Sequence, residues 1–333
     1  MPIRTLHQTD LFHPHADPDD HWDLACQFAL AYLGHTRLDG ILVDHPPDRV
    51  DCGDPAIASI HQLGSLTGLS VPCAVGIPSP YPEDPEVSRH NGGIRLVLRV
   101  LAESPEPVTL HIVGSCRDVA IAGLLRPDLF RDKCRAIYLN AGSARSDEHS
   151  LEYNVQLDPL AFHRIFRIPC PIYWMPCFEA AVRFETARYG TYYRFRQREI
   201  LPFLSNGLRQ YFLYALDRMD EGRWLGFLSQ PADPVRLDVC GDTFRNMWCT
   251  GGFFHAAGLG VTRDGAIRPL SEGTDGLACD FFPVEADCAD TGVVTWTPSE
   301  RNTGRYLFEV QDPTVYPEAM IRAMRTLLSA IPG

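Results

Sequence analysis

The chain has 333 residues, of which 45% are hydrophobic and 22% are charged, as is typical of a globular protein with a sizeable core. Its net charge of −12 argues against nucleic acid or an anionic membrane as the main partner. No apolar run reaches the roughly 18 residues of a membrane span, and the first residues lack the apolar core of a signal peptide. Eleven scattered cysteines without a CxxC pair favour reduced thiols, so we expect a cytoplasmic protein.

Strand-like and helix-like patterns alternate through about the first 175 residues. A helix is predicted before Gly34, because its apolar residues recur at three- and four-residue spacing. The predicted strands lie at residues 40–44, 71–76, 108–113, 136–139 and 171–175, with helices between them. These strands are continuously apolar, which favours an α/β fold with a mostly parallel sheet flanked by helices on both faces. Ligands of such folds bind at the carboxyl ends of the strands.

The second half of the chain is predicted to complete the same domain. Residues 179–221 are aromatic-rich and are predicted to form a helical excursion over the site. Further strands are predicted at residues 235–240 and 292–296, and an amphipathic helix ends the chain. Because no internal repeat or low-complexity segment divides the sequence, residues 1–333 are predicted to form a single domain.

Residues 10–20 collect two histidines and several carboxylates directly before the first predicted helix. His13 and His15 alternate, so both would point to one face of an extended segment. Asp19 and Asp20 would lie at the start of the helix, where negative charge is stabilised. The segment lacks the glycine and the distal glutamate of an EF-hand calcium loop. For each residue alone, a capping or hydrogen-bonding role is an open alternative to a role in a site.

Other candidate residues follow the later strands. Asp44 ends the strand predicted at residues 40–44, and residues 114–118 form a turn that could offer backbone groups to a ligand. Glu152 and Asn154 would lie on one side of an extended segment, either binding sugar hydroxyls or facing solvent. Cys249 precedes two glycines and is either a ligand or a buried core thiol. The sequence contains no GxSxG motif, P-loop or GxGxxG motif.

Taken in order, these clusters resemble the inosine–uridine-preferring nucleoside hydrolase family. The family's first motif, DxDPGxDD, corresponds to residues 13–20, and its substrate-contacting residue after the second strand corresponds to Asp44. Its third motif corresponds to residues 114–123 and its GGA…AEFN…DP segment to residues 140–159. Its late HDPxAVA helix corresponds to residues 248–254. The resemblance covers nearly the whole chain. It implies a nucleoside hydrolase-like fold, a small nucleoside or ribosyl substrate, and a homodimer or homotetramer.

The departures from the family motifs concern a metal site. The family holds Ca²⁺ with first-motif aspartates, a threonine carbonyl and a late aspartate. The corresponding residues, which we predict as metal ligands, are His13, His15, Asp20, Arg117 and Cys249. Calcium is implied by the resemblance, whereas imidazole and thiolate ligands would better suit zinc or iron.

Three interpretations of function remain open. The first is hydrolysis of the N-glycosidic bond of a nucleoside or related ribosyl compound by metal-activated water. In that interpretation His15 and Asp19 are catalytic, and the substrate-binding residues are Asp19, Asp44, Glu152 and Asn154. The second is a catalytically inactive protein that binds ribose or a nucleoside. The third is a metal-dependent, amidohydrolase-like enzyme in which the His13-x-His15 pair ends the first strand of a barrel.

Overall fold

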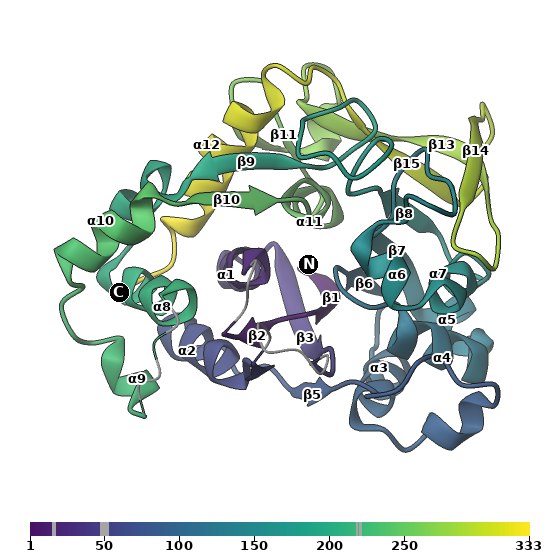
Figure 1. Ribbon diagram of the computed structural model, residues 1–333, viewed down its shortest axis with the longest axis horizontal. Coiled ribbons are helices and arrows are strands. Elements are labelled where there is room, and N and C mark those ends of the chain that lie inside the picture. The colour runs from purple at the N-terminus through teal and green to yellow at the C-terminus, as the bar shows by residue number, and fades with distance from the viewer. Residues whose placement is uncertain (15–17, 47–52, 218, 220–221) are drawn as a thin grey trace.

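The computed structural model describes residues 1–14, 18–46, 53–217, 219 and 222–333. Its main sheet contains β1 (Ile3–Thr9), β3 (Thr36–Val43), β5 (Cys73–Val75), β6 (Val108–Ile112), β7 (Cys134–Asn140), β8 (Ile172–Met175), β13 (Cys279–Cys288), β14 (Val294–Pro298) and β15 (Arg305–Val310). The nine strands are ordered β14-β13-β15-β8-β7-β6-β1-β3-β5 (Figure 1). All neighbouring strands from β15 to β5 pair in parallel. Strand β13 pairs antiparallel with both β15 and β14. The prediction of a mostly parallel sheet is therefore confirmed.

Helices pack against both faces of this sheet (Figure 1). One face carries α1 (Asp19–Tyr32), α2 (Ile57–Thr67), α8 (Asn206–Leu216), α11 (Thr250–Ala256) and α12 (Tyr316–Leu328). The other carries α3 (Gly92–Glu103), α4 (Arg117–Leu125), α5 (Pro127–Lys133) and α7 (Pro159–Ile165). Each face has its own hydrophobic core, with Trp22 and Phe28 buried in the first and Phe162 and Trp174 in the second.

Shorter elements connect this frame. The remaining strands are β2 (Phe12–His13), β4 (Asp54–Pro55), β9 (Tyr193–Arg196), β10 (Phe244–Met247), β11 (Leu259–Val261) and β12 (Ile267–Pro269), and the remaining helices are α6 (Tyr153–Leu157), α9 (Trp224–Phe227) and α10 (Pro234–Asp242). These six strands form three two-stranded sheets, in which β2 pairs with β4, β9 with β10 and β11 with β12. In the described part of the chain, no helix is both long and apolar enough to cross a membrane.

Two predictions for the second half of the chain are corrected by the structure. The segment 179–221 contains the strand β9 as well as the helix α8, so it is helical only in part. Residues 235–240 lie in α10 and not in a strand. Their alternating apolar residues resemble a strand, but Asp233 caps a helix by accepting a hydrogen bond from the Val235 amide at 2.9 Å. The strand predicted at 292–296 corresponds to β14.

The strand order reverses between β1 and β6, and this reversal positions the site. From β1 the chain adds β3 and β5 on one side, then returns to add β6, β7 and β8 on the other. In open α/β sheets, a crevice forms outside the carboxyl ends of the strands at such a switch point. Gly114, just after β6, lies so close to its neighbours that a Cβ there would be 2.6 Å from Asp44 Oδ2 and 2.9 Å from the Asp10 nitrogen. Only glycine lets the three strand ends converge.

Candidate functional site

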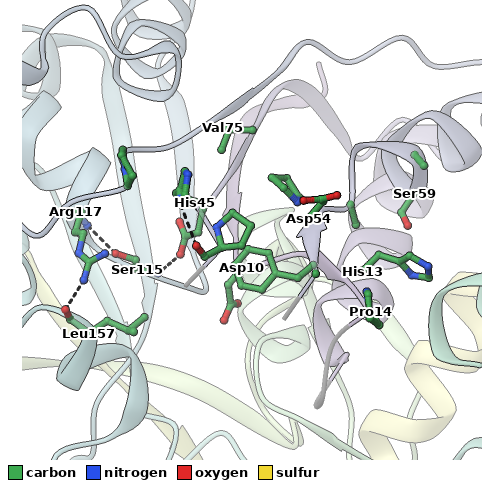
Figure 2. Close-up of a pocket in the computed structure, with 18 of the residues that line it drawn as sticks. Asp10, His13, Pro14, His45, Asp54, Ser59, Val75, Ser115, Arg117 and Leu157 are labelled. Carbon is green, nitrogen blue, oxygen red and sulfur yellow. Dashed lines mark hydrogen bonds between the residues drawn. The ribbon is translucent and has the colours of Figure 1, made fainter. Parts of the chain in front are cut away.

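A pocket of about 1160 Å³ opens at the carboxyl ends of β1, β3 and β6. Asp10 follows β1, Asp44 follows β3 and Ser115 follows β6, and all three line the pocket. Other residues lining it include Phe12, His13, His45, Asp54, Ser59, Arg117, Tyr153, Leu157 and Tyr214. Figure 2 shows Asp10 in the middle of this pocket, between Arg117 on one side and His13 on the other.

Asp10 belongs to a group of carboxylates that extends into the start of α1. Asp20 is buried, and its Oδ1 accepts a hydrogen bond from the hydroxyl of Thr9. Burial raises the pKa of Asp20 well above its usual value, and the like charges of Asp10, Asp19 and Asp23 raise it further. Negative groups that are this close and partly removed from water favour a shared proton or a bound cation. The predicted catalytic residue Asp19 therefore lies within electrostatic reach of Asp20.

Asp44, after β3, is hydrogen-bonded to residues at the ends of β1 and β6. Its Oδ2 accepts a hydrogen bond from the Ser115 amide at 2.6 Å, and its Oδ1 accepts one from the side-chain amide of Gln8. Burial raises the pKa of Asp44 well above its usual value, as does the charge of Asp10, while the Ser115 hydrogen bond opposes this. Asp44 thus lines the pocket as predicted, but both of its oxygens also hold the fold.

Glu152 and Asn154 have different roles in the structure. Glu152 caps α6, because its Oε1 accepts from the Asn154 amide at 2.9 Å and its Oε2 from the Gly142 amide at 2.8 Å. Burial raises the pKa of Glu152 to about 7, against the opposing effect of these backbone hydrogen bonds. The Asn154 side chain donates to the Val113 carbonyl at 3.2 Å, whereas its buried Oδ1 has no hydrogen-bond partner among the described residues. Asn154 itself does not line the pocket, although its neighbour Tyr153 does, so its Oδ1 is an unsatisfied acceptor beside the pocket wall.

Arg117 contributes its side chain to the pocket. The sequence prediction was that its backbone carbonyl would bind a metal. The guanidinium Nε lies 3.2 Å from Asp158 Oδ2. Its Nη2 donates to the Leu157 carbonyl at 2.5 Å, as Figure 2 shows. Arg117 is the first residue of α4, which begins directly at the pocket wall. The direction of this long side chain depends on α6 and α7 and could not be inferred from local sequence.

The predicted soft-metal ligands make separate contacts. His13 lies in β2, outside the main sheet, where its ring stacks on Tyr214 with 4.5 Å between centroids and its Nε2 is 2.9 Å from the Met219 carbonyl. Cys249 is buried before α11 and donates to Asn140 Oδ1 at 3.2 Å. Burial raises the pKa of its thiol well above the usual value, which opposes the thiolate that a metal requires. His15 lies outside the described residues.

Asp10 is the site residue that the sequence prediction missed. The first strand ends at Thr9, so the carboxylate directly after it is Asp10. The strand escaped notice because Thr5, His7, Gln8 and Thr9 are polar although all are buried. The barrel interpretation is also wrong, because the sheet is open with β14 and β5 at its edges and His13 lies outside it.

The donor chemistry of the pocket suits a hard cation better than zinc or iron. Asp10 lines the pocket and its charge acts on the neighbouring Asp20, and carboxylate oxygens are the donors that Ca²⁺ or Mg²⁺ prefers. Within residues 1–14, 18–46, 53–217, 219 and 222–333, however, no group of three or more His, Cys, Asp or Glu side chains is arranged to hold a metal ion.

Comparison with known proteins shows the fold. No protein-family model matches the sequence, and no curated protein matches it. An inosine-guanosine nucleoside hydrolase matches with a TM-score of 0.56 at 14% identity over 98% of both chains. A purine-preferring ribonucleoside hydrolase from Gardnerella vaginalis matches at 0.55 and 10% identity, over 98% of this chain and 99% of that one. The type III effector XopQ, solved with adenosine diphosphate ribose, matches at 0.53 and 16%, over 98% and 95%. The chain therefore has the predicted nucleoside hydrolase-like fold.

Proposed function

We propose that the chain hydrolyses the N-glycosidic bond of a ribosyl compound in the pocket around Asp10. The observation that carries this proposal is the half-buried Asp10 carboxylate, placed at the β1/β6 switch point in an open pocket of about 1160 Å³. The likeness in fold to structures of nucleoside hydrolases supports the same reaction class.

The chemistry of the reaction suits this arrangement. Cleavage of a glycosidic bond develops positive charge on the sugar ring, and the carboxylates of Asp10, Asp20 and Asp44 would stabilise that charge. Asp10 is the group in the pocket that would accept the proton of the attacking water. Asn154 lies next to the lining residue Tyr153, and its unsatisfied Oδ1 would accept a hydrogen bond from a ribose hydroxyl that reaches it. The carboxylate of Asp19 is also proposed to bind the substrate.

A divalent cation of the calcium type belongs to this proposal. Asp10 and Asp20 would hold it, since the charge of Asp10 raises the pKa of Asp20 and a bound cation would offset this repulsion. When bound, such an ion lowers the pKa of a water molecule and orients it. Elemental determination on the purified protein tests this part: calcium or magnesium supports it, and zinc or iron contradicts it.

The reaction is tested with a panel of purine and pyrimidine ribosyl compounds in the presence of Ca²⁺, by measuring released base and free sugar. We expect Asp10→Asn to lower kcat by about 10²- to 10⁴-fold, because a general base is lost. Asp54→Asn is the matched control, since Asp54 is an exposed carboxylate of the same pocket, and it should keep the wild-type rate. Wild-type turnover by Asp10→Asn, or no cleavage of any compound, contradicts the proposal.

A second candidate is a ribose-binding protein without catalysis, because His13 and His15 stand where the family's first motif has aspartates. Both oxygens of Glu152 and both oxygens of Asp44 are already hydrogen-bonded within the fold. Two of the predicted substrate-binding carboxylates would then be structural. Calorimetric binding of ribose with no turnover under any divalent metal would select this candidate.

A further inference from the structure

The lining of the pocket changes in chemistry from one end to the other. Figure 2 shows Arg117 and Leu157 at one end, Asp10 in the middle and His13 at the opposite end. The pocket therefore offers a cation, then carboxylates, then an aromatic surface. A nucleotide has the complementary order of phosphate, ribose and base.

The guanidinium of Arg117 is held in place before any ligand arrives. Asp158 and the Leu157 carbonyl fix it, and its side chain is 17% exposed. Asp158 is itself held by the backbone amides of Tyr81 at 2.6 Å and Ala161 at 3.0 Å, so its position does not depend on Arg117 alone. A fixed guanidinium loses little conformational freedom when it binds a phosphate, and its planar donors match phosphate oxygens.

Arg117 also stands out among the residues that line the pocket. Among the described lining residues it is the one Lys or Arg, and it lies on the opposite side of Asp10 from His13 (Figure 2). The positive N-terminal end of α4 adds to the same side, because the helix begins at Arg117. An anionic group of a ligand would be attracted to the Arg117 end of the pocket. It would be repelled by Asp54, which lies toward the His13 end.

The opposite end provides an aromatic surface. The rings of His13 and Tyr214 are stacked, with 4.5 Å between centroids and 9° between planes, and both residues line the pocket. Rigid aromatic surfaces of this kind stack nucleobases without strong preference among them. With about 1160 Å³, the pocket also exceeds the roughly 300–1,000 Å³ of ordinary small-molecule sites.

We propose that the substrate of this pocket is a ribosyl 5′-phosphate, with Arg117 binding the phosphate, Asp10 facing the ribose and the His13–Tyr214 pair contacting the base. This inference rests on the proposed function, since it assigns the substrate class of the same pocket. It adds a negatively charged group to the neutral nucleoside that the sequence resemblance implies.

Binding is tested first, by calorimetry with ribose and ribose 5-phosphate on the wild-type protein. We expect ribose 5-phosphate to bind about 10- to 100-fold more tightly, as for a hydrogen-bonded ion pair. Arg117→Gln should abolish this preference and Arg117→Lys should restore part of it. Arg126→Gln, which breaks an ion pair with Asp128 that does not line the pocket, is the matched control and should retain it. Equal affinities for the two sugars in the wild-type protein, or a preference that survives in Arg117→Gln, would overturn the inference.

Turnover then separates this inference from the proposed function. We expect kcat/KM for inosine 5′-monophosphate to exceed that for inosine by about 10- to 100-fold. Adenosine diphosphate ribose compared with adenosine 5′-monophosphate distinguishes a pyrophosphate-linked from a terminal phosphate. Cleavage of inosine with no preference for phosphate overturns the inference but supports the reaction. A preference for ribose 5-phosphate without cleavage of any compound supports the inference and refutes the reaction.

Discussion

Two imidazoles lie buried in neighbouring strands beneath the pocket. His7 of β1 and His111 of β6 are paired in register, with 6.3 Å between ring centroids, and both pack edge-on against Phe253. Burial lowers the pKa of His111 to about 3 and that of His7 well below its usual value, and His111 lowers the latter further. Both rings are therefore neutral in the folded protein near pH 7, and each resists protonation where the unfolded chain does not.

We predict that His111→Phe reduces the acid sensitivity of the fold. The unfolded His111 binds a proton below pH about 6.5, but the folded one does so only near pH 3, so stability is lost as the pH falls through this range. Between pH 7 and pH 5 this one group removes about 2 kcal/mol. Urea unfolding at the two pH values should show that loss diminished in His111→Phe. The exposed His35→Phe serves as control, and equal pH dependence of the wild type and His111→Phe would contradict the prediction.

The individual residues of the candidate site were only partly predictable from the sequence. Asp44 could be placed because it follows an obviously apolar strand. Asp10 could not, because β1 buries polar side chains whose partners come from distant strands. Likewise, Glu152 and Asn154 were predicted as a pair, yet Glu152 Oε2 accepts from the Gly142 amide and the Asn154 side chain donates to the Val113 carbonyl. Residue type and spacing indicated some of the polar residues that line the pocket, whereas side-chain direction required the tertiary contacts.

The elements were predicted best where capping and periodicity agree. Helix α3 begins after Asn91, whose Oδ1 accepts hydrogen bonds from the Gly93 amide at 2.7 Å and the Ile94 amide at 3.4 Å. Its apolar residues then recur on one buried face, as the sequence predicted. In α10 the two signals conflict, because Val235 and Val239 are exposed and alternate like strand residues while Asp233 caps a helix. The capping signal corresponds to the observed structure.

We predict that Asn91→Ala lowers the free energy of unfolding by about 1 kcal/mol, the usual effect of removing a helix N-cap. Asn91→Asp should retain most of the stability, since aspartate also caps and its charge suits the N-terminal end of a helix. Chemical denaturation of the three proteins at pH 7 measures both differences. If Asn91→Asp were as unstable as Asn91→Ala, the cap would not be the source of the effect.

At the scale of the whole molecule, one sheet separates two hydrophobic cores. Met324 of α12 is fully buried on one face, and Phe162 of α7 is fully buried on the other. The strands between them contribute alternate residues to each core, as Ile41 and Leu42 of β3 do. Because both cores are built on the same nine-stranded sheet, we expect them to unfold together, as the single domain predicted for residues 1–333 requires.

This cooperativity is testable with one large-to-small substitution in each core. Met324→Ala should cost about 2–5 kcal/mol and Phe162→Ala about 3–5 kcal/mol. Each variant should still show one transition when circular dichroism and tryptophan fluorescence are followed together. Val182→Ala, at an exposed position, is the control and should leave the midpoint unchanged. Two separated transitions in either core variant would show that the layers are independent domains.

The contact of Gly114 with Asp10 and Asp44 also bears on how such a site could be altered. The approach of the strand ends is a property of the backbone, because any Cβ at position 114 would collide with the main chain of one neighbour and the carboxylate of the other. The shape of the pocket is therefore fixed separately from the side chains that give it chemical character. Protein engineers could exchange the latter to redirect the pocket toward other ligands, provided that this glycine is kept.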